Sequence, residues 1–182
     1  GNLRSAEKAL ARAASDGGTG HEIVVTSDAN VVVEAERVVL PGVGAFADCM
    51  KGVSSIPHMI EALRDKVLDK GAPFLGICVG MQLMAERGFE HGEHEGLGWI
   101  AGDCSAIAGD GLKVPHMGWN QVEQRRPHHV WRDIPDGARF YFVHSYYVVP
   151  ADEPPAASTL PSARRMNTGL SEGTIPSAVA RA

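Results

Sequence analysis

The sequence contains no run of lysine and arginine residues. Its adjacent basic residues form only the pairs Arg125-Arg126 and Arg164-Arg165, and the formal net charge is −5. A protein that follows a nucleic-acid backbone needs a basic stripe to neutralise the phosphates. The composition therefore argues against a nucleic-acid partner.

Cysteine is also scarce. The chain has three cysteines, Cys49, Cys78 and Cys104, and no Cys-x-x-Cys spacing. This excludes the usual sequence signatures of a zinc site and of a disulfide framework, so we expect no metal. A sparse set of thiols without partners is typical of a reducing cytoplasm.

Long apolar segments are absent as well. No stretch approaches the roughly 18–20 apolar residues of a membrane span, and the first residues show no signal-peptide pattern. We therefore expect a cytoplasmic protein without membrane contact. The chain has 182 residues, of which 44% are hydrophobic and 21% charged. That length and composition suit a single domain, residues 1–182, with a sizeable core.

Helical and strand patterns alternate in the first half and give way to β patterns in the second. The predicted helices cover residues 3–14, 57–69 and 79–87. The predicted strands cover residues 22–26, 37–40 and 74–77, followed by β segments at 99–107, 113–123 and 139–149. This order predicts an α/β fold: a mostly parallel central sheet with helices on both faces, plus an additional β-rich section. From Pro150 onward no period is clear.

The segment with the strongest chemical signal is Phe74-Leu75-Gly76-Ile77-Cys78-Val79-Gly80-Met81-Gln82. An apolar run ends at a cysteine between small residues, as in the Gly-x-Ser-x-Gly nucleophile elbow of hydrolases. The thiol would lie at the N-terminal end of the following helix, which favours the thiolate. The backbone N–H of Val79 would face a developing oxyanion. The alternative is a buried structural cysteine after a core strand.

A second glycine-rich segment, Leu40-Pro41-Gly42-Val43-Gly44-Ala45-Phe46, follows the β-branched pair Val38-Val39. Its glycines would let backbone N–H groups approach a ligand closely. Parallel strands place their carboxyl ends, and hence their ligands, at one edge of a sheet. We therefore expect Val43 or Gly44 to supply a second oxyanion donor beside Cys78. An ordinary turn is the alternative.

Histidines and aromatic residues are dense in two later segments. These are Val114-Pro115-His116-Met117-Gly118-Trp119-Asn120 and Phe140-Tyr141-Phe142-Val143-His144-Ser145-Tyr146-Tyr147. His144 is either a base for Cys78 or a structural histidine bonded to the backbone. Trp119 and Tyr141 are either core residues or interface anchors.

Taken together, these segments resemble one family. The chain is similar to the glutaminase subunit of imidazole glycerol phosphate synthase, a class I (triad) glutamine amidotransferase of histidine biosynthesis with a flavodoxin-like fold. The segments that carry the resemblance are Gly1-Asn2-Leu3-Arg4-Ser5, Leu40 to Phe46, Gly76 to Leu83, Gly96-Leu97-Gly98, Pro115 to Asn120 and Tyr141 to Tyr146. They occur in family order over residues 1–150.

The resemblance implies an activity. Cys78 would attack the side-chain amide of glutamine, forming a glutamyl thioester as ammonia leaves, and water would then release glutamate. Ammonia would pass to a (β/α)₈-barrel cyclase subunit, forming a heterodimer with this chain, which makes imidazole glycerol phosphate and an aminoimidazole carboxamide ribotide. No organic cofactor is implied.

The resemblance also implies roles for individual residues. In the family's pattern His144 is not the base, which favours the structural interpretation of that histidine. The residues expected to hold glutamine are Gly42, Gly44, Gln82 and the backbone of His144, Ser145 and Tyr146. The residues expected near the partner interface are Asn2, Trp119 and Tyr141.

The chain departs from the family pattern at both ends. The family's Gln-Phe-His-Pro-Glu motif, which supplies the base and its orienter, has no counterpart, because no histidine follows His144. The pattern also expects a strand before Gly1. Residues 151–182 resemble a replaced or out-of-frame segment. These departures predict slow turnover and a weakly stable, aggregation-prone chain.

Three functional hypotheses follow. The first is a glutaminase subunit that is catalytically impaired. The second is a non-catalytic amidotransferase-like subunit that only docks on a barrel partner. The third is another cysteine-elbow enzyme, such as a peptidase-like relative that uses His144 as its base. The intact elbow favours the first, because a docking module has no need for Cys78.

Overall fold

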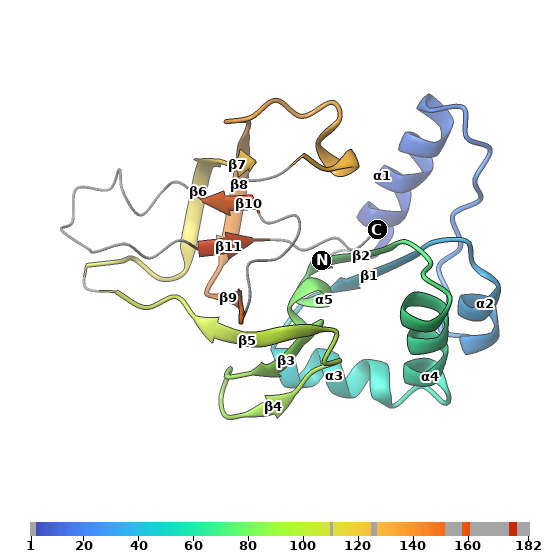
Figure 1. Cartoon of the computed structure of the whole chain (residues 1–182), viewed down its shortest axis with the longest axis horizontal. Helices are drawn as coiled ribbons and strands as arrows, with labels where there is room; N and C mark the ends of the chain where they lie inside the picture. The colour runs from blue at the N-terminus through green and yellow to red at the C-terminus, as the bar shows by residue number, and fades with distance from the viewer. Residues whose placement is uncertain (1–2, 110, 125–126, 152–157, 161–174, 178–182) are drawn as a thin grey trace. The chain divides into compact units, whose positions relative to one another are not determined.

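The computed structural model describes residues 3–109, 111–124, 127–151, 158–160 and 175–177 (Figure 1). The chain forms two compact units, residues 1–81 and residues 82–181. Each unit has its own secondary structure and its own buried residues, and the single domain over residues 1–182 stays a prediction. Asn2 lies outside the described residues, as does most of the segment 151–182.

The first unit contains helices and a two-stranded parallel sheet. Its helices are α1 (Leu3–Asp16), α2 (Ala29–Glu34), α3 (Phe46–Ser54), α4 (Met59–Arg64) and the π-helical turn η1 (Asp65–Asp69). Its strands are β1 (Val38–Gly42) and β2 (Phe74–Cys78). Helix α5 (Val79–Gln82) begins directly after β2.

Local chemistry explains most of these elements. Asp28 caps α2, since its carboxylate accepts a hydrogen bond from the Asn30 N–H at 2.9 Å. The predicted helix over 57–69 is present as α4 and η1. Helix α3, which the sequence pattern did not reveal, is anchored by Phe46, whose side chain is almost fully buried. Leu63 on α4 is buried to the same degree.

One predicted strand in this unit is wrong. Residues 22–26 form no strand, and Val24 and Val25 are 56% and 46% exposed. A β-branched run becomes a strand only when a neighbouring strand accepts and donates its ladder hydrogen bonds. Among the described residues β1 and β2 pair only with each other, so this segment has no ladder partner.

The second unit is rich in β-structure. Its strands are β3 (Ala85–Gly88), β4 (His94–Glu95), β5 (Ile100–Ala106), β6 (His116–Gln121), β7 (Glu123–Gln124), β8 (Arg139–His144), β9 (Tyr146–Pro150), β10 (Ser158–Leu160) and β11 (Ile175–Ser177), with a 3₁₀ turn η2 (His129–Trp131). They form the sheets β4-β3-β5-β9, β6-β8 and β11-β10-β7. The pair β3–β5 is parallel and the other pairs are antiparallel. The β-rich second half is therefore confirmed.

The predicted helix over 79–87 is wrong beyond Gln82. The carbonyl of Leu83 accepts the Leu97 N–H at 2.7 Å, and the carbonyl of Met84 accepts the Trp99 N–H at 2.9 Å. A continuing helix would need those carbonyls for amides four residues further on. The side chains of Leu83, Met84 and Ala85 are instead buried in the second unit, at 1%, 3% and 0% exposure.

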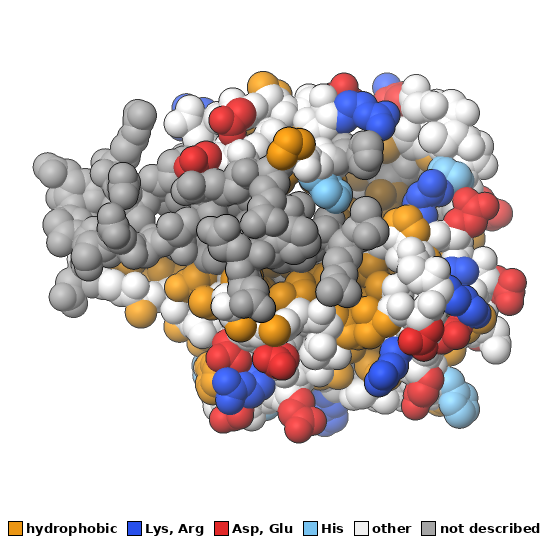
Figure 2. All heavy atoms as spheres, in the orientation of Figure 1, with side chains coloured by type: hydrophobic (Ala, Val, Ile, Leu, Met, Phe, Trp, Pro, Cys, Tyr) orange, Lys and Arg blue, Asp and Glu red, His pale blue; other side chains and the backbone are white. Residues whose placement is uncertain are grey.

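Apolar side chains also remain at the surface of both units, and orange spheres on the face drawn in Figure 2 show such surface. In the second unit the most exposed large ones are Met117, Trp119, Tyr141 and Val143. All four lie on the β6–β8 ribbon.

Candidate active site

The two parallel strands of the first unit bring the predicted nucleophile and the predicted oxyanion loop side by side. Strands β1 and β2 lie side by side (Figure 1). In their parallel register Leu40 is opposite Gly76 and Gly42 is opposite Cys78. Both strands end at the same edge, where ligands of parallel sheets bind. Cys78 and the Val43-Gly44 turn are therefore neighbours, as the sequence predicts.

Cys78 has the backbone of a nucleophile elbow. Its φ is +57°, in the left-handed region that residues with a Cβ rarely adopt. The residue is exposed and its thiol is free. This excludes the alternative of a buried structural cysteine. A sharp turn that presents an exposed nucleophile at the end of a strand is the arrangement that nucleophile elbows share.

Glycines allow the helix after the elbow to lie directly on the strands. An ideal Cβ on Gly80 would overlap the carbonyl oxygen of Leu40, and one on Gly42 would lie 2.6 Å from the Gly80 nitrogen. A Cβ on Gly76 would lie 2.5 Å from the Met81 Cα. No side chain fits at these contacts. The glycines on either side of Cys78 are thus required by close backbone approach.

A thiol on the following helix holds the Val43-Gly44 turn in place. The Cys49 Sγ, on α3, donates a hydrogen bond to the Val43 carbonyl at 3.3 Å. In a trans peptide the carbonyl and the following N–H point in opposite directions, so the Gly44 N–H points away from Cys49. Gly44 has a φ of +110°, a backbone conformation that glycine adopts most readily. No other atom lies within 4 Å of the position that a Cβ would occupy there.

Burial makes poor nucleophiles of the two other cysteines. Burial raises the pKa of Cys49, partly opposed by the hydrogen bond to Val43, and the nearby Asp48 and Cys78 raise it further. Burial raises the pKa of Cys104 to about 12, with a smaller effect from Glu90. A raised pKa leaves little thiolate near neutrality, and the thiolate is the reactive form.

The predicted glutamine-binding residues of the second unit meet at one carbonyl. The Gln82 Nε2 donates to the Tyr146 carbonyl at 3.2 Å, and the His144 Nδ1 lies 3.0 Å from the same oxygen. Gln82 is 7% exposed. The Ser145 carbonyl accepts the Ile107 N–H at 2.8 Å. His144 is therefore a histidine bonded to the backbone, which agrees with the structural interpretation.

Two residues that the sequence did not single out as site residues join this group. The His116 Nδ1 lies 3.1 Å from the His144 Nε2, and the Asn120 Nδ2 lies 2.7 Å from the His116 Nε2. Strand β6 places both side chains on one face because they are four residues apart. That even spacing and a strand over residues 139–149 were both predicted from the sequence, but the register in which β6 pairs with β8 was not.

The opposite face of the β6–β8 ribbon carries the predicted interface pair. Trp119 is opposite Tyr141, and their rings meet edge to face with centroids 5.7 Å apart. They are 61% and 54% exposed. This excludes the alternative that they are core residues. Met117 and Val143, the next pair in register on the same face, are equally open.

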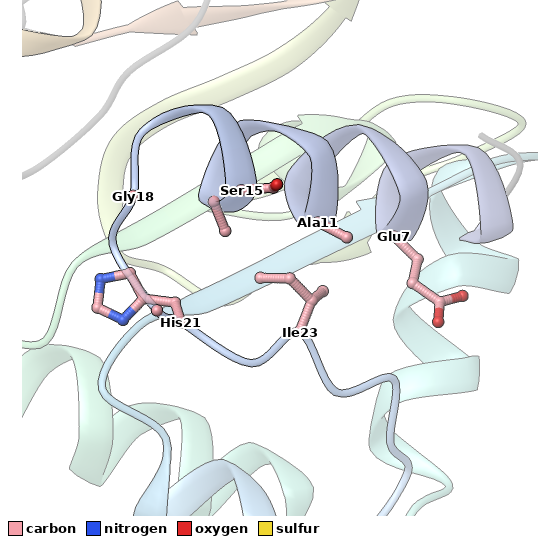
Figure 3. A pocket seen from close by; sticks show the side chains of 8 residues that line it. Glu7, Ala11, Ser15, Gly18, His21 and Ile23 are labelled. Carbon is pink, nitrogen blue, oxygen red and sulfur yellow. The ribbon is translucent and has the colours of Figure 1, made fainter.

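Other features of the described residues do not compete with this site. A depression between α1 and the segment that follows it is lined by Glu7, Ala11, Ser15, His21 and their neighbours (Figure 3). None of the predicted site residues lines it. Within the part of the chain that the structure describes, no group of three or more His, Cys, Asp or Glu residues could hold a metal. No described helix is long and apolar enough to cross a membrane.

Comparison with known proteins gives the same result as the motifs. Residues 2–176 match the family described as "Glutamine amidotransferase class-I". Proteins named "Imidazole glycerol phosphate synthase subunit HisH" are similar over most of the chain. That of Rhodospirillum rubrum is 57% identical over 155 residues, covering 84% of this chain and 72% of its own length. That of Brucella suis is 54% identical over 151 residues, covering 80% of this chain and 70% of its own length.

A solved structure also shares the fold. It is described as "Crystal structure of glutamine amidotransferase", with a TM-score of 0.61 and 18% identity, covering 84% of this chain and 71% of that chain. At this identity the likeness concerns the fold, and it confirms the predicted α/β fold class. The chain therefore belongs to the class-I glutamine amidotransferases, in the family of the imidazole glycerol phosphate synthase subunit HisH.

Proposed function

We propose that this chain hydrolyses glutamine at Cys78 and supplies the ammonia to imidazole glycerol phosphate synthesis. The observation that carries the proposal is the elbow: an exposed thiol at φ +57°, paired in register with Gly42 and next to the Val43-Gly44 turn. A subunit that only docks on a partner needs none of this geometry.

The chemistry follows from the groups at the elbow. The Cys78 thiolate adds to the carboxamide carbon of glutamine, and the carbonyl oxygen becomes an oxyanion. We assign the two oxyanion donors to the backbone N–H groups of Val79 and Gly44. Val79 is the first residue of α5, where N–H groups have no partner within the helix. Gly44 presents its N–H away from Cys49 because the Val43 carbonyl is bonded to that thiol.

Collapse of the tetrahedral intermediate completes the cycle. The carbon–nitrogen bond breaks, the leaving nitrogen takes up a proton from a water molecule, and ammonia departs while a γ-glutamyl thioester remains on Cys78. Water then adds to the thioester, and glutamate and the thiolate are released. Every step uses the thiol, backbone donors and water, and the proposal includes neither a metal nor an organic cofactor.

We assign glutamine recognition to Gly42, Gly44, Gln82 and the 144–146 segment. Gln82 is the last residue of α5, the helix that begins directly after Cys78. Its carboxamide is held by the Tyr146 carbonyl. A buried carboxamide with a fixed orientation can distinguish the donor and acceptor ends of a second amide.

We assign the exposed face of the β6–β8 ribbon to the partner, a (β/α)₈-barrel cyclase subunit. An exposed apolar surface is formed by Met117, Trp119, Tyr141 and Val143. Contiguous exposed apolar patches are typical of interaction sites. Tryptophan and tyrosine are the residues most often found at the energetic centre of an interface. Three free thiols and a biosynthetic role fit the reducing cytoplasm.

The test separates glutamine chemistry from docking. The chain is combined with the barrel subunit, and synthesis of imidazole glycerol phosphate is followed with glutamine or with free ammonia as nitrogen donor. We expect Cys78→Ala to abolish synthesis from glutamine and to leave synthesis from ammonia unchanged. Unchanged synthesis from glutamine in Cys78→Ala would refute the proposal.

A further inference from the structure

We propose that Asn120 and His116 are positioning residues for glutamine recognition, acting through His144 on the Tyr146 carbonyl and on Gln82. The inference rests on the proposed function, because Gln82 matters only if glutamine is bound. Neither residue is expected to touch the substrate. Their role is to fix the direction of one hydrogen-bonded chain that ends at the recognition group.

The chain of contacts is continuous. It runs from the Asn120 Nδ2 to the His116 Nε2 at 2.7 Å, from the His116 Nδ1 to the His144 Nε2 at 3.1 Å, and from the His144 Nδ1 to the Tyr146 carbonyl at 3.0 Å. The Gln82 Nε2 meets the same carbonyl at 3.2 Å. The contacts cross from β6 to β8 and then reach β9, so three strands are tied together.

The two ends of this series of hydrogen bonds, at Asn120 and at Tyr146, require the same proton positions on the histidines. An amide nitrogen can only donate, so the Asn120 end requires the His116 Nε2 to accept. Neutral His116 then carries its proton on Nδ1 and donates to His144. A carbonyl can only accept, so the Tyr146 end requires the His144 Nδ1 to donate. Neutral His144 then accepts at Nε2, which matches the proton on His116.

The surroundings of His116 favour its neutral form. His116 stacks on Phe142 with ring centroids 5.6 Å apart, and both histidines are half-buried. Burial lowers the pKa of His116, and the neighbouring His144 lowers it further. A single orientation of the Tyr146 carbonyl, and so of the Gln82 carboxamide, follows from this arrangement.

The first arm of the test reads the proton positions directly. Long-range ¹H–¹⁵N NMR of the histidine rings in the full chain distinguishes the two tautomers at neutral pH. We expect both His116 and His144 to carry the proton on Nδ1. A proton on Nε2 of either ring would overturn the inference, whatever the chain does with glutamine.

The second arm measures how well the chain recognises a glutamine analogue. A diazoketone analogue of glutamine alkylates the elbow thiol, and its saturation gives a concentration for half-maximal inactivation and a limiting rate. We expect Asn120→Ala to raise the half-maximal concentration about tenfold, the effect of one lost hydrogen bond, and to leave the limiting rate within about twofold. Gln121→Ala, at the next position on the opposite, exposed face, is the control and should change neither.

An isosteric variant separates positioning from folding. In Asn120→Asp the carboxylate can only accept, so the His116 Nε2 must donate to it. The direction of each following hydrogen bond is then reversed, and neutral His144 has no proton on Nδ1 to donate to the Tyr146 carbonyl. If the histidine pair binds one more proton, the His144 Nδ1 again donates to the Tyr146 carbonyl. We therefore expect the half-maximal concentration of this variant to fall as the pH falls, with no such trend in Gln121→Ala. A pH-independent value equal to that of the unmodified chain would overturn the inference.

The two proposals fail in different ways. If the unmodified chain shows no saturable inactivation by the analogue, the proposed function is wrong, and the tautomers still decide whether the chain of contacts exists. If inactivation saturates and Asn120→Ala does not alter it, the positioning role is wrong and the function stands.

Discussion

Replacing Gly80 with alanine tests whether the elbow needs the close contact of α5 with β1. The added Cβ would overlap the Leu40 carbonyl oxygen and would lie 2.8 Å from the Leu40 carbonyl carbon and 3.2 Å from that of Pro41. Ordinary contact begins at about 3.4 Å. All these atoms are backbone, so no side-chain rotation relieves the overlap, and α5 must move away from β1.

The size of the effect on stability and on reactivity follows from this contact. Overpacking of a filled interior costs about 1–3 kcal/mol, and a rigid backbone contact belongs at the upper end, about 3 kcal/mol. A displacement of about 1 Å in a reacting group costs about 100-fold in rate. We therefore expect Gly80→Ala to lower the free energy of unfolding and to slow alkylation of Cys78 by the glutamine analogue by about that factor.

The matched control is Gly52→Ala. Gly52 lies in α3 of the same unit, and its Cβ would meet nothing within 4 Å. Alanine is favoured over glycine in a helix by about 0.5–1 kcal/mol, so this variant should be slightly stabilised and react normally. Denaturant unfolding and mass-detected alkylation measure both quantities. If Gly80→Ala matched the unmodified chain in stability and reactivity, the reasoning about the elbow would be wrong.

Three further predictions concern other parts of the structure. With iodoacetamide at pH 8, we expect exposed Cys78 to be labelled first, Cys49 more slowly and Cys104 only after unfolding. The raised pKa values of Cys49 and Cys104 keep these two thiols protonated, and the protonated form does not react. Peptide mapping measures the order, and early labelling of Cys104 would contradict the prediction. Trp119→Ala should change the free energy of unfolding by less than about 0.5 kcal/mol but weaken binding of the barrel subunit by about 2 kcal/mol, measured by calorimetry; equal affinities would place the interface elsewhere. The folded state lowers the pKa of His116, so the unfolded chain binds more protons and stability should fall as the pH drops below about 6.5. That loss should be smaller in His116→Phe, and an equal loss would show that another group is responsible.

The sequence predicted the elbow because its determinants are local. Gly76, Cys78 and Gly80 are contiguous with a short apolar strand, and their spacing alone implies a tight turn. The same holds for the Val43-Gly44 turn after β1. The sequence also placed Trp119 and Tyr141 among possible interface residues, and their exposure agrees with that alternative.

Tertiary hydrogen bonds account for what the sequence did not predict. Residues 83–87 have helix-forming side chains, yet the carbonyls of Leu83 and Met84 accept from the 97–100 segment. Residues 22–26 have strand-forming side chains but no ladder partner in the described part of the chain. The pairing of His116 with His144 depends on the register of β6 and β8, which no local pattern specifies.

The most direct test of the account is glutamate release from glutamine by this chain, mixed with the barrel cyclase subunit and its nucleotide ligand. The account predicts release that disappears in Cys78→Ala, even if the rate is low. Release that persists in Cys78→Ala, or its complete absence while the complex still makes imidazole glycerol phosphate from free ammonia, would contradict it.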